Sequence, residues 1–278
     1  MDEADVMIFW SHGSVPNTSR PAFHRPTKFV DLGPTHSFSE QVEGMNWPHP
    51  LKYVIDTRLS GVRVRRVGLL GFSASVAGVS AFLRSADAGI IDTAVVIDGV
   101  SCRTAAYPAE RGASLGPYTK LGKLAAFGTP PQSDLPSGSR CMVITNSHAN
   151  GLPGMDPTWR TSREILDRIT NNIPFQTDPL PAEVFDDPAR HPWTNPAGSH
   201  TWPDGTTTTW RKTTYDRPPV EYAVRIGDLY VLSYSLVDPT SIGDHRYQAA
   251  VVMPMVLESI VAARWNALEP GSGSCVVV

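Results

Sequence analysis

One stretch of the chain, RRVGLLGFSASVAGVSAFL at residues 65–83, constrains the fold more than any other. Its first half is an apolar run of strand length, and its second half repeats apolar residues at the spacing of one helix face. Because no loop separates the two halves, the chain must turn from a buried strand directly into a helix. Ser73 stands at that turn, where a serine acts either as a helix cap or as a nucleophile.

The same alternation of strand-like and helix-like runs recurs along the chain. Strands are expected at 5–13, 66–72, 91–100 and 140–147, a hairpin at 221–235, and helices at 73–89, 117–128, 161–172 and 246–265. Pro254 is expected to kink the last helix or to mark the point where a new helix starts. Apolar strand centres between helices are typical of a parallel sheet that is covered on both faces. We therefore predict an α/β fold with a mostly parallel sheet flanked by helices.

Composition narrows the functional classes. The 278 residues carry a formal net charge of -3 and three cysteines without a C-x-x-C pair, so we expect no nucleic-acid partner, no metal and no other cofactor. The one dense basic cluster, at residues 63–66, is interpreted as the solvated start of a strand. Neither a signal peptide nor a membrane span is recognisable, which predicts a cytoplasmic protein.

The domain organisation is expected to be simple. A single domain is predicted over residues 1–268, with an aromatic-rich insertion at about 179–219 and a flexible tail at 269–278. A homodimer is one arrangement that the sequence allows.

The candidate site residues follow the predicted strands, because ligands of open parallel sheets bind at the carboxyl ends of the strands. Ser73 and Asp98 each follow a strand, and His245 lies after the last one. A serine hydroxyl is a weak nucleophile until an imidazole takes its proton and a carboxylate orients that imidazole. These three side chains supply the required groups. Asp156 and Asp238 remain alternatives for the carboxylate, and Asp98 then caps a turn.

The chain order of serine, aspartate and histidine, with the segment GFSAS at residues 71–75, resembles the α/β-hydrolase superfamily. That family places its nucleophile in a G-x-S-x-G turn between a strand and a helix. The resemblance covers about residues 5–265 and departs from the pattern at Ser75, where a small side chain replaces glycine. It implies a catalytic triad of the three residues named above, in a serine esterase or lipase-like enzyme. The minimal core is similar to bacterial or phage-borne hydrolases.

The resemblance also implies where a developing negative oxygen would be stabilised. The backbone N–H of Ala74 and that of Gly13 or Ser14, in the His12-Gly13 loop after the first strand, are the expected donors. His148, after the strand at 140–147, is a candidate to contact a substrate oxygen or to orient the acid, and a structural role is the more common one for such a histidine.

The sequence thus predicts a serine hydrolase that cleaves a carboxylic ester, such as an acyl or acetyl ester on a glycan or lipid, through an acyl-enzyme on Ser73. An amidase or peptidase of the same fold is one alternative. A non-catalytic binding or structural protein is another, because a fold does not fix its chemistry. Trp193, Trp202 and Trp210 of the insertion form either a substrate platform or the packing of a lid, hairpin or subunit contact.

Overall fold

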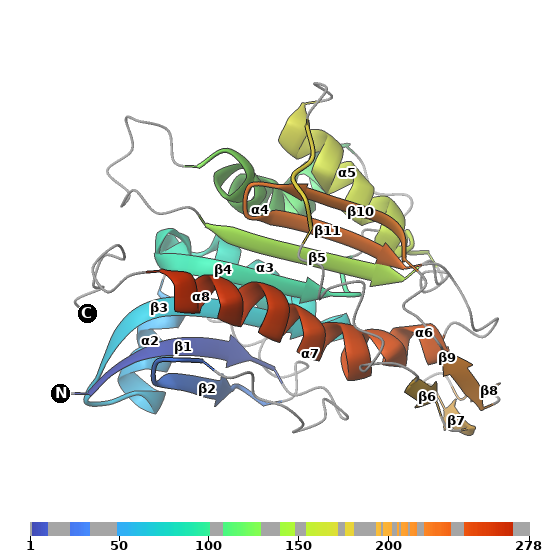
Figure 1. The fold of residues 1–278 in the computed structure, drawn as a ribbon, viewed down its shortest axis with the longest axis horizontal. Coiled ribbons are helices and arrows are strands. Elements are labelled where there is room, and N and C mark those ends of the chain that lie inside the picture. Colours follow the sequence, from blue (N-terminus) through green and yellow to red (C-terminus); the bar gives the residue numbers. More distant parts are fainter. Residues whose placement is uncertain are drawn as a thin grey trace.

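A seven-stranded sheet with the strand order β10-β11-β5-β4-β3-β1-β2 forms the centre of the protein (Figure 1). The computed structural model describes residues 2–10, 23–33, 49–100, 108–128, 140–147, 154–171, 176–180, 193–195, 197–201, 205, 207–210, 212–215, 220–234 and 242–268. The strands are β1 (Asp2–Phe9), β2 (Thr27–Asp31), β3 (Val62–Phe72), β4 (Ile91–Ile97), β5 (Cys141–Ser147), β10 (Val220–Ile226) and β11 (Leu229–Tyr234). Neighbouring strands pair in parallel, except β10 with β11, which form the predicted hairpin. The predicted α/β class is confirmed.

The path of the chain through this sheet reverses direction beside β1. The chain runs from β1 to the edge strand β2, then returns to the other side of β1 with β3, and continues outward through β4 and β5. In open α/β sheets, the crevice at such a switch point, outside the carboxyl ends of the strands, is the usual place for a ligand. Ser73 comes immediately after β3. The topology therefore places Ser73 at the switch point.

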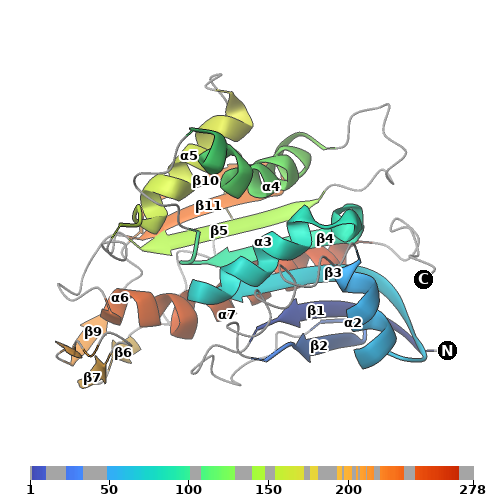
Figure 2. The ribbon, with the colours of Figure 1, turned by 180° about the vertical axis from the view of Figure 1, so that it is seen from behind.

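Helices cover both faces of the sheet. One face carries α2 (Pro50–Arg58), α3 (Val76–Arg84), α4 (Pro108–Phe127) and α5 (Thr158–Thr170), which Figure 2 views from the front. The other face is covered by the helical segment 242–267, in front in Figure 1. Each face has its own hydrophobic cluster, one with Phe82 and Ile165 and one with Val256 and Trp265. Burial on both faces explains why the strand centres are continuous apolar runs.

The C-terminal helical segment continues through Pro254 without a break. It consists of α6 (Ile242–Tyr247), α7 (Met253–Val256) and α8 (Ala263–Ala267), joined by π-helical turns at Gln248–Val252 and Leu257–Ala262. Proline removes a hydrogen-bond donor and crowds the preceding turn, and a wider turn next to it accommodates both effects. The helix does not restart at Pro254, and the adjacent wider turns accommodate the proline instead.

The structure corrects the interpretation of the basic cluster at 63–66. Arg63 is exposed and pairs with Glu3, but Arg66 is buried. The Arg66 guanidinium lies 3.6 Å from the Asp5 carboxylate and donates a hydrogen bond of 3.0 Å to the carbonyl oxygen of Trp265. The burial of Arg66 was not predicted because Asp5 and Trp265, which pair with it, lie in β1 and α8 and are remote from it in the sequence.

Part of the predicted insertion forms two small antiparallel pairs beside α6 (Figure 1). They are β6 (Trp193–Asn195) with β9 (Thr213–Tyr215), and β7 (Gly198–Thr201) with β8 (Thr207–Trp210). Trp202 lies outside the described residues, so the role of the tryptophans stays a prediction. Among the described helices, none combines the length and apolar character needed to cross a membrane.

Close contact between α3 and the end of β1 gives a stability prediction. A Cβ atom at Gly78 would lie 2.4 Å from the indole of Trp10, which is fully buried against Phe82. We expect Gly78→Ala to lower the free energy of unfolding by about 1–3 kcal/mol, measured by urea denaturation, because the core must shift to admit the methyl group. Gly112→Ala on α4, where nothing lies within 4 Å, is the control. It should raise the stability by roughly 0.5–1 kcal/mol, and a loss at both sites would contradict the argument.

Candidate active site

The turn between β3 and α3 holds Ser73 in an uncommon backbone conformation. Its φ angle is +55°, whereas Phe72 before it is extended and Ser75 after it is right-handed helical. For a residue with a Cβ atom this left-handed conformation costs about 1–2 kcal/mol. Such strain collects at functional sites, where the surrounding structure enforces it. The direct strand-to-helix turn expected from the sequence is present, with Ser73 at its apex.

Close packing around this turn explains the glycines beside it. A Cβ atom at Gly71 would lie 2.8 Å from Cγ2 of Val79, and one at Gly99 would lie 2.3 Å from the carbonyl oxygen of Ser73. Neither distance is possible between real atoms without a shift of the backbone or core. The turn after β4, which includes Asp98 and Gly99, therefore packs directly against the backbone of Ser73.

Ser75, the residue that departs from the G-x-S-x-G pattern, clamps the turn. Its side chain is fully buried, and its Oγ accepts a hydrogen bond of 2.5 Å from the N–H of Phe72 and donates one of 2.6 Å to the Phe72 carbonyl. Its φ angle of -67° is open to any residue, so the backbone does not require glycine. The serine thus supplies two bonds between the helix start and β3 that glycine lacks.

Asp98 lies at the end of β4, buried and with a φ angle of +44°. Its Oδ1 accepts hydrogen bonds from the N–H of Ser147 at 2.8 Å and the hydroxyl of Thr158 at 2.7 Å. Its Oδ2 accepts one from the Ser147 hydroxyl and lies 2.7 Å from Nδ1 of His245. Burial opposes ionisation, but His245, Ser147 and Thr158 together outweigh it and hold the pKa of the carboxyl below its ordinary value. Asp98 is therefore an ionised acceptor.

His245 reaches the same point from α6, on the opposite face of the sheet. Its Nδ1 contacts Asp98, and its ring stacks on Phe72 with 4.6 Å between the ring centroids. Phe72 directly precedes Ser73, so the imidazole lies beside the strained turn. Because Nδ1 faces the carboxylate, Nε2 is the ring nitrogen left for proton exchange. The His245 side chain is 29% exposed, which leaves it accessible from solvent.

The structure pairs Asp156, one alternative for the carboxylate, with other groups. Its oxygens lie 2.6 Å from Arg111 and 3.3 Å from Arg160, while His245 contacts Asp98. The predicted site residues Gly13, Ser14 and His148, and the alternative Asp238, lie outside the described residues.

Ala74 is exposed and follows Ser73 in the short helical turn that leads into α3. Backbone N–H groups at the start of a helix have no partner within the helix. Because Ala74 directly follows Ser73 in the chain, we predict that its N–H donates to a substrate oxygen bound near Ser73. The donor role remains a prediction.

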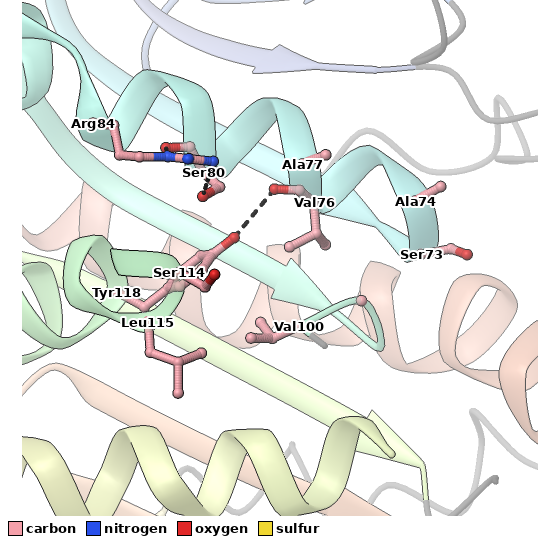
Figure 3. Close-up of a pocket in the computed structure, with 11 residues that line it drawn as sticks. Ser73, Ala74, Val76, Ala77, Ser80, Arg84, Val100, Ser114, Leu115 and Tyr118 are labelled. Carbon is pink, nitrogen blue, oxygen red and sulfur yellow. Dashed lines mark hydrogen bonds between the residues drawn. The ribbon is translucent and has the colours of Figure 1, made fainter. Parts of the chain in front are cut away.

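A cavity of about 320 Å³ begins at the Ser73 turn and lies between α3 and α4 (Figure 3). In this view the Ser73 side chain points away from Tyr118 and Leu115 on the other wall. Three polar side chains of the cavity form hydrogen bonds within it: Tyr118 donates to the Val76 carbonyl at 3.2 Å, and Arg84 donates to the Ser80 hydroxyl at 3.0 Å. The cavity thus adjoins the turn behind the Ser73 hydroxyl.

Comparisons with protein-family models, curated proteins and solved structures give no match for the chain. Within the described residues, no group of three or more His, Cys, Asp and Glu side chains is arranged to hold a metal ion. The interpretation of the site therefore depends on its own geometry.

Sequence reasoning missed Thr158 as a partner of Asp98. The helix was predicted to begin at Thr161, but α5 begins at Thr158, after the extended Pro157. Ser147 is the last residue of the strand predicted at 140–147. No local pattern indicates that its side chain bonds to Asp98, because the two residues are 49 positions apart.

The Ser75 clamp predicts a loss of stability in Ser75→Ala. The substitution leaves the N–H of Phe72 buried and without its partner, which should cost about 1–3 kcal/mol of unfolding free energy in a urea titration. Ser60→Ala, at an exposed serine in a turn, should stay within about 0.5 kcal/mol of the parent protein. Equal stability of the two variants would show that the Ser75 bonds contribute nothing.

Proposed function

We propose that the protein is a serine hydrolase that cleaves a carboxylic ester by acyl transfer through Ser73. The observation that carries the proposal is the position of His245, which bonds to Asp98 at 2.7 Å and stacks on the residue before Ser73. An imidazole oriented by a buried carboxylate, next to a serine on a strained turn, is the arrangement that activates a hydroxyl nucleophile. The α/β fold with its mostly parallel sheet is compatible with the α/β-hydrolase superfamily.

In the proposed reaction, the Ser73 hydroxyl attacks the ester carbonyl while Nε2 of His245 takes its proton. Asp98 keeps the imidazole in the tautomer with a proton on Nδ1 and stabilises the imidazolium that forms. His245 then gives the proton to the leaving alcohol, and an acyl ester on Ser73 remains. A water molecule, deprotonated by His245, releases the acid and restores the serine.

Stabilisation of the tetrahedral intermediate is assigned to backbone donors. The Ala74 N–H follows the nucleophile directly, as the N–H of an oxyanion hole does in this type of site. The second donor is proposed to be Gly13 or Ser14, which come after β1 in the sequence, and β1 is the neighbour of β3 in the sheet. Preorganised donors of this kind are among the largest contributions to the rates of such enzymes.

The proposed substrate class is a carboxylic ester, with acyl or acetyl esters on glycans or lipids included. Esters are favoured over amides as the starting point for assays because the alcohol leaves more readily and reports even modest activity. The same triad chemistry cleaves amides, so amide substrates belong in the same screen.

The nucleophile assignment is tested with Ser73→Ala. We expect the parent protein to hydrolyse short-chain p-nitrophenyl esters and to be labelled by a fluorophosphonate probe, and the variant to do neither. Ser60→Ala, at the exposed serine in the turn before β3, should match the parent in both assays. Retained activity in Ser73→Ala would contradict the assignment. A folded parent protein that neither turns over esters nor takes the probe would favour a binding protein on this scaffold.

The role of the carboxylate is tested with Asp98→Asn. The amide no longer stabilises an imidazolium and favours the wrong imidazole tautomer, so kcat should fall by about 10⁴-fold. Asp56→Asn, which removes an exposed partner of Lys52 on α2, is the charge-matched control and should leave kcat unchanged. A loss of less than tenfold in Asp98→Asn would move the role to another carboxylate, with Asp238 the next to test.

A further inference from the structure

The carboxylate of Asp98 has a full set of hydrogen-bond partners. An ionised carboxylate offers about four acceptor directions, two on each oxygen. At Asp98 these are met by the Ser147 N–H, the Ser147 hydroxyl, the Thr158 hydroxyl and Nδ1 of His245, all at 2.7 or 2.8 Å. Three of the four directions are thus occupied by groups other than the histidine.

These partners come from two elements on which Asp98 does not lie. Ser147 is the last residue of β5 and fully buried, and Thr158 is the first residue of α5. The Thr158 hydroxyl also lies 3.3 Å from the Ser147 carbonyl, but its bond to Asp98 is shorter and is the stronger of the two. The carboxylate is therefore fixed in rotation as well as in position.

We infer that Thr158 and Ser147 are positioning residues, which hold the Asp98 carboxylate so that one lone pair of Oδ2 is aimed at Nδ1 of His245. The inference rests on the proposed function, because it assigns these residues a task only if Asp98 orients a catalytic histidine. The side-chain hydrogen bonds of both residues go to Asp98, and the Thr158 hydroxyl also reaches the Ser147 carbonyl. The role assigned to them is therefore one that acts through Asp98.

A clasp between α4 and α5 holds Thr158 in place. Arg111 on α4 bonds to Asp156, two residues before Thr158, and to Glu164 one to two turns after it. Further along the pair, a Cβ atom at Gly122 on α4 would lie 2.2 Å from the Ile169 side chain on α5, so the two helices are in close contact. The two helices also lie side by side in Figure 2. The first turn of α5 is thereby fixed against the end of the sheet, where its threonine reaches Asp98.

The groups around Asp98 differ in charge, and this difference predicts a measurable change in the pH dependence of kcat/KM. Of the elements packed against Asp98, α6 contributes the titratable ring of His245, while β5 and α5 contribute neutral N–H and hydroxyl donors. Loss of a donor to the ionised form raises the pKa of a carboxyl. With one donor fewer, the negative charge of the Asp98 carboxylate is less neutralised and attracts a proton on the imidazole more strongly. Both effects favour protonation of the Asp98–His245 pair, so the acid limb of the kcat/KM profile should move to higher pH.

The test compares Thr158→Val with Thr158→Ser and Thr161→Val. Valine keeps the shape of threonine and removes the hydroxyl, and serine keeps the hydroxyl. Thr161 is also buried in α5, but its hydroxyl bonds to the Pro157 carbonyl. In ester hydrolysis, we expect Thr158→Val to lower kcat/KM about tenfold and to shift its acid limb upward by several tenths of a pH unit. Thr158→Ser and Thr161→Val should keep the parent profile.

A second measurement does not depend on activity. The Nδ1 proton of His245, observed by proton NMR in protein labelled with ¹⁵N-histidine, should change its chemical shift in Thr158→Val and in Ser147→Ala. It should keep its position in Thr161→Val. Thermal unfolding of each variant separates a loss of fold from a change at the pair.

The outcomes distinguish this inference from the proposed function. If Ser73→Ala abolishes hydrolysis but Thr158→Val and Ser147→Ala leave both the acid limb and the Nδ1 resonance at the parent values, the positioning role is wrong and the hydrolase stands. If Ser73→Ala retains activity, the hydrolase itself is wrong. A shift of the resonance and the limb in Thr158→Val, restored in Thr158→Ser, supports the inference.

Discussion

The hydrogen bond between Asp98 and His245 joins the two sides of the sheet at one point. Asp98 directly follows β4. One of its partners, Thr158, begins α5 on one face of the sheet, whereas His245 lies in α6 on the other. A carboxylate buried without partners would be costly, so both helices must reach the end of β4 for this residue to remain ionised. The position of the candidate site is therefore a consequence of how both layers close over the same strand.

Two strained residues stand side by side at this edge. Ser73 and Asp98 have φ angles of +55° and +44°, and they follow the adjacent strands β3 and β4. Neither conformation is favourable in isolation, and each is held by local bonds: Ser75 fastens the turn after β3, and the donors from Ser147 and Thr158 fasten the one after β4. The strain of the site is thus balanced by interactions within the same few residues.

The sequence predicted the order of strands and helices well where the patterns were long and apolar, as in β3, β4, β5 and the helical segment 242–267. It missed β2, whose five residues include Lys28 and Asp31 and give no apolar run. It predicted a helix over residues 117–128, but α4 begins at Pro108 and includes Pro117. Ser73, Asp98 and His245 could be proposed because each follows a strand. The partners of Asp98, and the burial of Arg66, depend on contacts between residues far apart in the chain, which no local pattern contains.

The helical segment 242–267 also has a consequence for the order in which the protein can form. It provides most of the helical side of one hydrophobic cluster, and its end is held by Arg66 of β3 through the Trp265 carbonyl. During synthesis from the N-terminus, the strands β1 to β11 are complete before this segment leaves the ribosome, and the face that it covers stays open to solvent until then. His245 lies near the start of this segment, ahead of the residues from Tyr247 to Trp265 that belong to the cluster. During synthesis the histidine is therefore available before the core on this face can be completed, and a completed core always has the histidine in place.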